Sequence, residues 1–288
     1  MNKYIGTGVA LITPFDKDNN VDYIALKKLV DFQINNGINY LVILGTTGES
    51  ATLNKKEQKK VIQTIVATNN ERLPLVLGIG GNNTQQVIED IKNADLSDFD
   101  AILSVSPSYN KPTQEGIYQH FKKIANTTNK DIILYNVPHR TGKNVEPKTI
   151  IRLANNCKNI IAVKDAASDL QQTLEIIRTK PKDFLVISGD DSLALSSVLA
   201  GGSGVISVIG QGMPNEFTQM INLGLAGKNK EAFELYYQLM PLTALIFKEG
   251  NPAGIKAILH HKEICNIQVR LPLIKASDTL YHAIVNEL

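Results

Sequence analysis

Residues 160–165 read Ile-Ile-Ala-Val-Lys-Asp, a short apolar run (160–163) that ends in a lysine. Similar runs recur along the chain, each followed by a longer amphipathic segment, at residues 6–12, 40–44, 75–79, 101–105, 132–135, 184–187 and 204–208. Strands that are apolar on both faces are typical of a parallel sheet covered by helices. Eight βα units in a row therefore predict an α/β protein with a closed (β/α)8 TIM barrel, rather than a doubly wound sheet.

The alternation stops after about Leu225. Residues 231–247, 251–260 and 276–288 have helical spacing. We expect a catalytic barrel over residues 1–225 and a C-terminal helical region over 226–288, joined by a linker at 227–230. Local signals give further expectations, namely helix N-caps at Asp22, Asn54 and Thr84, a helix end at Asn36-Gly37, and first-turn prolines at Pro147 and Pro214.

Composition excludes several classes of protein. Hydrophobic residues make up 43% and charged residues 20%, and the net charge of +2 is too small to suggest nucleic acid as a partner. Cys157 and Cys265 form no CxxC pair, and no histidine lies in an HExxH pattern, so we expect neither a disulfide scaffold nor a metal site. Without a signal peptide or an apolar stretch of ~20 residues, the sequence predicts a cytoplasmic protein with no membrane partner.

Catalytic groups of such barrels lie at the carboxyl ends of the strands and in the loops that follow. Polar residues gather there in five segments: Gly45-Thr46-Thr47-Gly48-Glu49-Ser50, Ser106-Pro107-Ser108-Tyr109-Asn110, Tyr135-Asn136-Val137-Pro138-His139-Arg140-Thr141-Gly142, Lys164-Asp165 and Ser188-Gly189-Asp190-Asp191. Desolvation at a strand end disfavours a charged ammonium, so Lys164 is a candidate Schiff-base lysine. Taken alone, Lys164 favours the simpler interpretation, a strand-end lysine that reaches water or pairs with Asp165.

The other groups are also ambiguous one by one. Tyr135 could be a core residue with a wet hydroxyl, and Thr46-Thr47 a simple loop or a cradle for a carboxylate. Arg140 could be a surface charge or a bidentate carboxylate clamp. We interpret Asp190-Asp191 as helix N-cap residues rather than metal ligands. A phenol, an amine, an arginine and a carboxylate cradle around one barrel mouth together indicate a Schiff-base enzyme acting on a 2-oxo acid.

Three of these motifs carry a family resemblance. Gly-Thr-Thr-Gly-Glu at 45–49, Tyr-Asn-Val-Pro-His-Arg-Thr-Gly at 135–142 and the strand-end Lys164-Asp165 resemble the 4-hydroxy-tetrahydrodipicolinate (dihydrodipicolinate) synthase family, related to N-acetylneuraminate lyase. Asp165 stands where glutamate is common in that family. The resemblance implies condensation of pyruvate with L-aspartate 4-semialdehyde to 4-hydroxy-tetrahydrodipicolinate, in lysine and diaminopimelate biosynthesis.

The resemblance also implies roles for individual residues. Lys164 forms an imine with pyruvate, so neither a metal nor an organic cofactor is needed. Tyr135, Thr46 and Tyr109 form a proton relay, with Tyr109 coming from a neighbouring subunit. Thr46 and Thr47 bind the pyruvate carboxylate, and Arg140 binds the carboxylate of aspartate semialdehyde. The main-chain carbonyls of Gly189 and Ile206 shape the pocket. The implied assembly is at least a homodimer, and a homotetramer is compatible with it.

Other functions stay open at this point. Another pyruvate-dependent aldolase, such as a sialic acid or keto-deoxy-sugar acid lyase, would share the lysine and tyrosine chemistry. Arg140 argues against a sugar substrate, which presents hydroxyls rather than a second carboxylate. A non-catalytic barrel would be expected to lose Lys164 or the relay, and a flavin or phosphate barrel needs a cradle that Gly201-Gly202-Ser203-Gly204, lying before its strand, does not provide.

Feedback inhibition by lysine is expected to be weak or absent. In lysine-sensitive members of the family, a second pocket at the dimer interface binds free lysine. The chain keeps part of that pattern at Ser50, Ala51 and Asn82 and departs from it at Lys55, Gln58, Gln86 and Ser108. Lys55 brings a like charge toward a cationic ligand, and Gln86 removes a pairing carboxylate.

Overall fold

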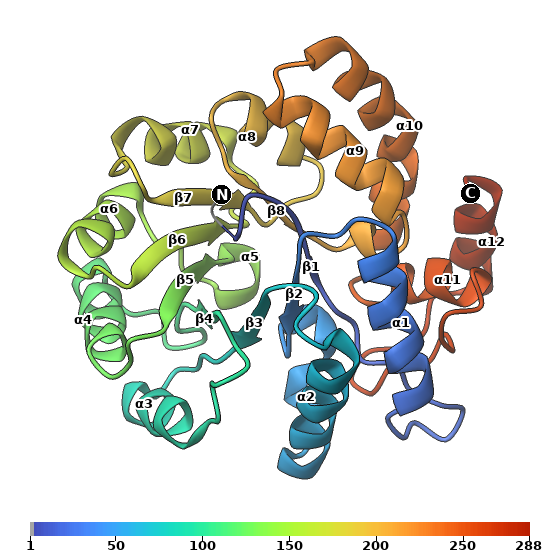
Figure 1. Ribbon diagram of the computed structural model, residues 1–288, viewed down its shortest axis with the longest axis horizontal. Coiled ribbons are helices and arrows are strands. Elements are labelled where there is room, and N and C mark those ends of the chain that lie inside the picture. The colour runs from blue at the N-terminus through green and yellow to red at the C-terminus, as the bar shows by residue number, and fades with distance from the viewer. Residues whose placement is uncertain (1–2) are drawn as a thin grey trace. The chain divides into compact units, whose positions relative to one another are not determined.

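A computed structural model describes residues 3–288 and confirms the predicted barrel (Figure 1). Parallel strands, each hydrogen-bonded to the next in chain order, close into a barrel. The strands are β1 (Gly6–Ala10), β2 (Tyr40–Ile43), β3 (Leu75–Gly78), β4 (Ala101–Val105), β5 (Asp131–Asn136), β6 (Ile160–Asp165), β7 (Leu185–Ser188) and β8 (Gly204–Ser207). Strand β6 continues through Lys164 and Asp165, so the candidate lysine is held by a backbone ladder.

The chain divides into two compact units. Unit 1 comprises the described residues up to Pro74 together with Ser207–Leu288, and unit 2 comprises Leu75–Ile206. The domain boundary expected at residue 225 lies inside unit 1 and stays a prediction. None of the helices within residues 3–288 combines the length and the apolar character that a membrane span requires.

Unit 1 contains the first two strands and the C-terminal helices. Its helical elements are α1 (Tyr23–Asn35), the 3-10 turns η1 (Thr46–Gly48), η2 (Ser50–Thr52) and η3 (Ile209–Gln211), α2 (Lys55–Asn69), α9 (Pro214–Leu225), α10 (Asn229–Phe247), α11 (Ala253–His261) and α12 (Asp278–Asn286). The expected N-caps are confirmed at Asp22, which accepts from two backbone N–H groups of α1, and at Asn54, which forms a capping box with Glu57. Helix α10 begins at Asn229, inside the expected linker.

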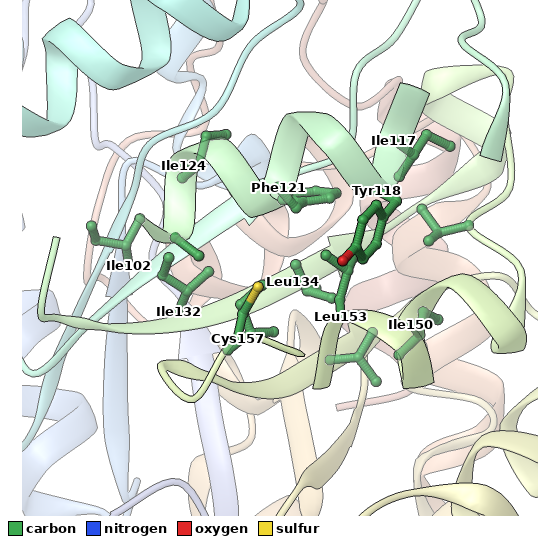
Figure 2. Packing of buried hydrophobic residues seen from close by; sticks show 14 of the residues in the cluster. Ile102, Ile117, Tyr118, Phe121, Ile124, Ile132, Leu134, Ile150, Leu153 and Cys157 are labelled. Atoms are coloured by element: carbon green, nitrogen blue, oxygen red, sulfur yellow. The ribbon is translucent and has the colours of Figure 1, made fainter. Parts of the chain in front are cut away.

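Unit 2 contains the strands that carry the candidate lysine and tyrosine. Its helices are α3 (Thr84–Asn93), α4 (Gln114–Ala125), α5 (Pro138–Thr141), α6 (Pro147–Asn156), α7 (Leu170–Thr179) and α8 (Ala194–Leu199). Helices α4 and α6 press apolar side chains against strands β4 and β5, where Phe121 and Leu153 meet Ile132 and Leu134 in a buried cluster (Figure 2). Burying such side chains stabilises the fold by about 1.5–3 kcal/mol each, which anchors the strands.

Two helix-cap predictions are wrong. Asn83 rather than Thr84 caps α3, because its side chain accepts from the first backbone N–H groups while the Thr84 hydroxyl is bonded to the His120 ring on α4. Asp190 and Asp191 do not cap α8, which begins only at Ala194 after an intervening turn. Asp190 holds that turn, because its side chain accepts from Ser192 N.

Candidate active site

Lys164 and Tyr135 form the centre of the candidate site in unit 2. They are Cα partners on the neighbouring strands β6 and β5, and the Lys164 Nζ lies 4.2 Å from the centre of the Tyr135 ring. Both side chains are buried, with 6% and 8% of their surface exposed. An amine held over the face of a phenol in a site shielded from water suits both nucleophilic attack and proton exchange.

Gly189 leaves the space that the Lys164 side chain occupies. A Cβ at Gly189 would lie 2.9 Å from Lys164 Cε and 2.7 Å from the Ala166 Cβ, so any larger residue would displace the lysine. The Gly189 N–H donates to the Asp165 carbonyl at 2.7 Å, which fixes the loop after β7 against β6. The pocket-shaping role that the family resemblance implies for the Gly189 carbonyl stays a prediction.

Asp165 faces the helices rather than Lys164. Its oxygens accept hydrogen bonds from Asn136 Nδ2 at 2.9 Å, Gln172 Nε2 at 3.3 Å and Thr173 Oγ1 at 3.1 Å. Burial raises the pKa of the Asp165 carboxyl, and these hydrogen bonds, led by that of Asn136, oppose the shift. Because successive strand residues point to opposite faces, the network lies behind the Tyr135–Lys164 pair and braces it.

Arg140 and Tyr109 lie in neighbouring segments of unit 2 that follow strands β5 and β4. Arg140 is exposed on the short helix α5. The backbone N–H of Tyr109 donates to the carbonyl of Thr141, the residue that follows Arg140, at 3.3 Å. Tyr109 has a positive φ of 68° and 90% of its side chain is exposed. A large aromatic side chain held outward in a strained backbone is free to contact another molecule.

Thr46 and Thr47 lie in unit 1, on the turn η1 that follows β2. Thr46 is exposed, whereas Thr47 is buried and accepts a hydrogen bond from Asn251 Nδ2 at 2.8 Å. Because Asn251 uses the oxygen of Thr47 as acceptor, the Thr47 hydroxyl proton is left to donate to an anion. Sequence reasoning missed Asn251, which lies 204 residues further along the chain.

The last predicted site residue, Ile206, is buried in strand β8 at the end of unit 2. Sequence reasoning also missed Lys256, an ammonium buried in α11 that pairs with Glu49 of the motif after β2. Its only sequence signal is a single charge within the otherwise apolar stretch 253–259. Within residues 3–288, no group of three or more histidine, cysteine or acidic side chains is placed to hold a metal ion.

Comparison with known proteins identifies the family. The model of the dihydrodipicolinate synthetase family matches residues 3–288. The chain belongs to this family. A 4-hydroxy-tetrahydrodipicolinate synthase of Flavobacterium psychrophilum is 57% identical to this chain over 280 residues. The aligned residues cover 97% of this chain and 96% of the relative.

Solved structures of the dihydrodipicolinate synthetase family agree with this assignment. The dihydrodipicolinate synthase of Thermotoga maritima has a TM-score of 0.96 and 36% identity, with 99% of this chain and 98% of that one covered. A protein described as the first monomeric dihydrodipicolinate synthase variant also has a TM-score of 0.96 and 36% identity, with 99% and 96% covered. The expected fold and the expected enzyme class, an aldolase-type lyase, are therefore confirmed.

Proposed function

We propose that the protein condenses pyruvate with L-aspartate 4-semialdehyde through an imine on Lys164, giving 4-hydroxy-tetrahydrodipicolinate for lysine and diaminopimelate biosynthesis. The observation that carries the proposal is the buried Lys164–Tyr135 pair on paired strands of a barrel that belongs to this family. The cytoplasmic location expected from the sequence stays a prediction.

Imine formation is the first half of the reaction. The neutral amine of Lys164 attacks the ketone carbon of pyruvate, and Tyr135 passes the proton that lets the oxygen leave as water. Thr46 and Thr47 hold the pyruvate carboxylate, with the Thr47 hydroxyl directed by Asn251. Functional groups of parallel barrels lie in the loops that follow the strands, which supports assigning a binding role to the loop after β2.

Carbon–carbon bond formation is the second half. The iminium withdraws electrons, so the pyruvate methyl group loses a proton and an enamine forms. The enamine carbon attacks the aldehyde carbon of aspartate semialdehyde, whose carboxylate is bound by Arg140. The substrate amine then attacks the imine carbon and displaces the Lys164 amine, which closes the ring. The imine itself supplies the electron sink, so the proposed mechanism uses no metal or organic cofactor, and the carbonyls of Gly189 and Ile206 shape the pocket.

The relay is completed by a second copy of the chain in this proposal. Tyr109 extends outward, with 90% of its side chain exposed, which suits a ring that enters the site of a neighbour. Together with Tyr135 and Thr46, it would carry protons between the bound substrate and water. The working unit is then at least a homodimer, and a homotetramer built from two such dimers keeps the same sites.

Covalent trapping tests the proposed function directly. Borohydride reduction in the presence of pyruvate is expected to fix the three-carbon unit on Lys164, as read by peptide mass spectrometry. Lys164→Ala should remain folded, take up no label and lose most activity. Label on another lysine, or none, would contradict the mechanism. Release of pyruvate from a sugar acid, without turnover of aspartate semialdehyde, would assign the chain to the sugar-acid lyases instead.

A further inference from the structure

A buried ion pair in unit 1 lies outside the machinery described above. The Lys256 Nζ on helix α11 is 2.6 Å from Glu49 Oε1, and the two side chains are 0% and 1% exposed. The same ammonium donates to the Gln268 carbonyl at 2.8 Å and lies 4.2 Å from the centre of the Phe15 ring. The second carboxylate oxygen of Glu49, Oε2, accepts a hydrogen bond from the backbone N–H of Arg270 at 2.9 Å. Both charges are thus bound by protein groups.

Glu49 also closes the turn that carries Thr46 and Thr47. Its backbone N–H donates to the Thr46 carbonyl at 3.0 Å, and its own backbone lies in the left-handed region with φ 51° and ψ 35°. A residue other than glycine remains in that region only where its surroundings fix it. The bonds from Lys256 and Arg270 to the Glu49 side chain supply that fixation.

The position of Glu49 creates an electrostatic problem that Lys256 removes. A carboxylate that directly follows an anion-binding turn would repel the carboxylate of an incoming substrate, and the repulsion is strong where water is excluded. A buried charge whose partner is missing is costly, whereas a buried pair that is fully hydrogen-bonded is tolerated. With Lys256 in place, Glu49 can fix the turn without opposing an anion.

We infer that Glu49 and Lys256 are positioning residues for the bound carboxylate of the 2-oxo acid: their ion pair holds the turn of Thr46–Gly48 in its binding geometry and compensates the charge beside it. This inference rests on the proposed function, because it assigns the turn to pyruvate. Neither residue touches the reacting atoms, so the effect acts on pyruvate affinity.

The second ion pair of this region ties the same segments together. Arg270 binds Glu57 through two side-chain hydrogen bonds of 2.6 and 2.9 Å and donates to the Thr52 carbonyl at 2.9 Å. Its guanidinium also lies 4.5 Å from the centre of the Phe15 ring. Arg270, in the segment after α11, therefore binds both η2 and the first turn of α2.

The test measures how borohydride trapping on Lys164 depends on pyruvate concentration. In Lys256→Met, the pyruvate concentration for half-maximal trapping should rise about tenfold or more, equivalent to about 1.4 kcal/mol. The double variant Glu49→Gln/Lys256→Met should lie between the wild type and Lys256→Met, because the uncompensated charge is gone but the turn is less fixed. The KM for aspartate semialdehyde should change little. Arg152→Met, which breaks an exposed ion pair with Glu115, is the matched control and should behave as the wild type.

The outcomes separate positioning from stability. A lower melting temperature in Lys256→Met with the wild-type pyruvate dependence of trapping would overturn the inference. If Lys256→Met does not fold, the double variant decides, with about a threefold rise expected and an unchanged dependence overturning the inference. Failure of the wild-type enzyme to trap pyruvate on Lys164 would overturn the proposed function. This outcome differs from failure of the inference, in which the wild type traps pyruvate normally.

Discussion

Asn136 Nδ2 donates to Asp165 Oδ1 at 2.9 Å, one residue beyond Tyr135 and Lys164 on the same two strands. Replacing Asp165 by alanine removes one of the two acceptors of each of the buried donors of Asn136, Gln172 and Thr173, so that one N–H of each amide loses its partner. We expect Asp165→Ala to lower the free energy of unfolding by about 3 kcal/mol or more, and to reduce kcat even where the variant is folded.

The conservative variant separates charge from shape at this position. Asp165→Glu keeps the carboxylate that the donors require and introduces the residue common in the family, so most activity should remain. Asp183→Ala, at an exposed position, serves as the control for thermal unfolding and kcat. Full stability and activity in Asp165→Ala would show that the network does not brace the strands.

Arg140→Ala should impair the use of aspartate semialdehyde and spare imine formation. Loss of a charge-assisted carboxylate contact costs on the order of 2 kcal/mol, or about thirtyfold in kcat/KM for aspartate semialdehyde. Arg140→Lys keeps the charge without the bidentate geometry, so its kcat/KM for aspartate semialdehyde should lie between those of the wild type and Arg140→Ala. Equal losses in pyruvate trapping and in turnover would point to a structural role for Arg140.

Subunits with different lesions should complement each other. Tyr109→Phe and Lys164→Ala subunits are each expected to have low activity, but a mixed dimer has one site with both lesions and one intact site. After random exchange of equal amounts, about a quarter of all sites are intact, so activity should return to about that fraction of the wild type. No recovery after mass spectrometry has confirmed mixed dimers would refute the shared site.

Acid should destabilise the protein through His120, which is buried between α3 and α4. Burial lowers the pKa of His120 to about 4, whereas in the unfolded chain the pKa is about 6.5. Between these two pKa values the unfolded state binds a proton on His120, whereas the folded state does not. Stability therefore falls as pH falls from about 6.5 to about 4. At pH 5 the loss amounts to about 2 kcal/mol.

Urea unfolding at pH 7 and pH 5 measures this effect. In His120→Gln, which keeps a side-chain amide able to bond to Thr84, the difference in unfolding free energy between the two pH values should shrink. His282→Gln, at an exposed position on α12, is the control and should keep the wild-type difference. An undiminished difference in His120→Gln would assign the acid sensitivity to other groups.

Lysine should inhibit the enzyme only weakly. The family resemblance implies a tyrosine in lysine-sensitive members at the position of Ser108 in unit 2. The Ser108 N–H and hydroxyl both donate to Asn82 Oδ1, at 2.9 and 3.0 Å. Gln86 replaces a carboxylate that would pair with the lysine ammonium. Half-inhibition at sub-millimolar lysine would contradict this prediction. The triple variant Lys55→His/Gln86→Glu/Ser108→Tyr should raise the sensitivity if these positions determine it.

All eight strands could be predicted because a strand covered on both faces has a continuous apolar pattern, but their ends could not. The first run continues through Ile12, yet β1 ends at Ala10, because the Ile12 N–H donates to the side chain of Gln211 rather than to a strand. Conversely, polar Lys164 and Asp165 extend β6, because backbone pairing with the strands on either side is indifferent to side-chain polarity.

The candidate site could be predicted only where the end of a strand marks each residue. Strand-end positions alone indicate Lys164 and Tyr135. The partners of the loop after β2 could not be found in this way, because Glu49 and Lys256 are 207 residues apart and no periodic pattern marks a buried ion pair. Long-range polar pairing is set by the packed fold, not by local spacing.

The contacts that Asn251, Lys256 and Arg270 make with the loop after β2 affect how the enzyme folds during its synthesis. Ribosomes extend a chain from its amino end, so every barrel strand emerges before residue 251. A nascent chain at that stage already carries Lys164 and Tyr135, but Glu49 still lacks the cation that compensates it. On the inferred role of that ion pair, competence to bind a 2-oxo acid arises only after residues 256–270 have been synthesised.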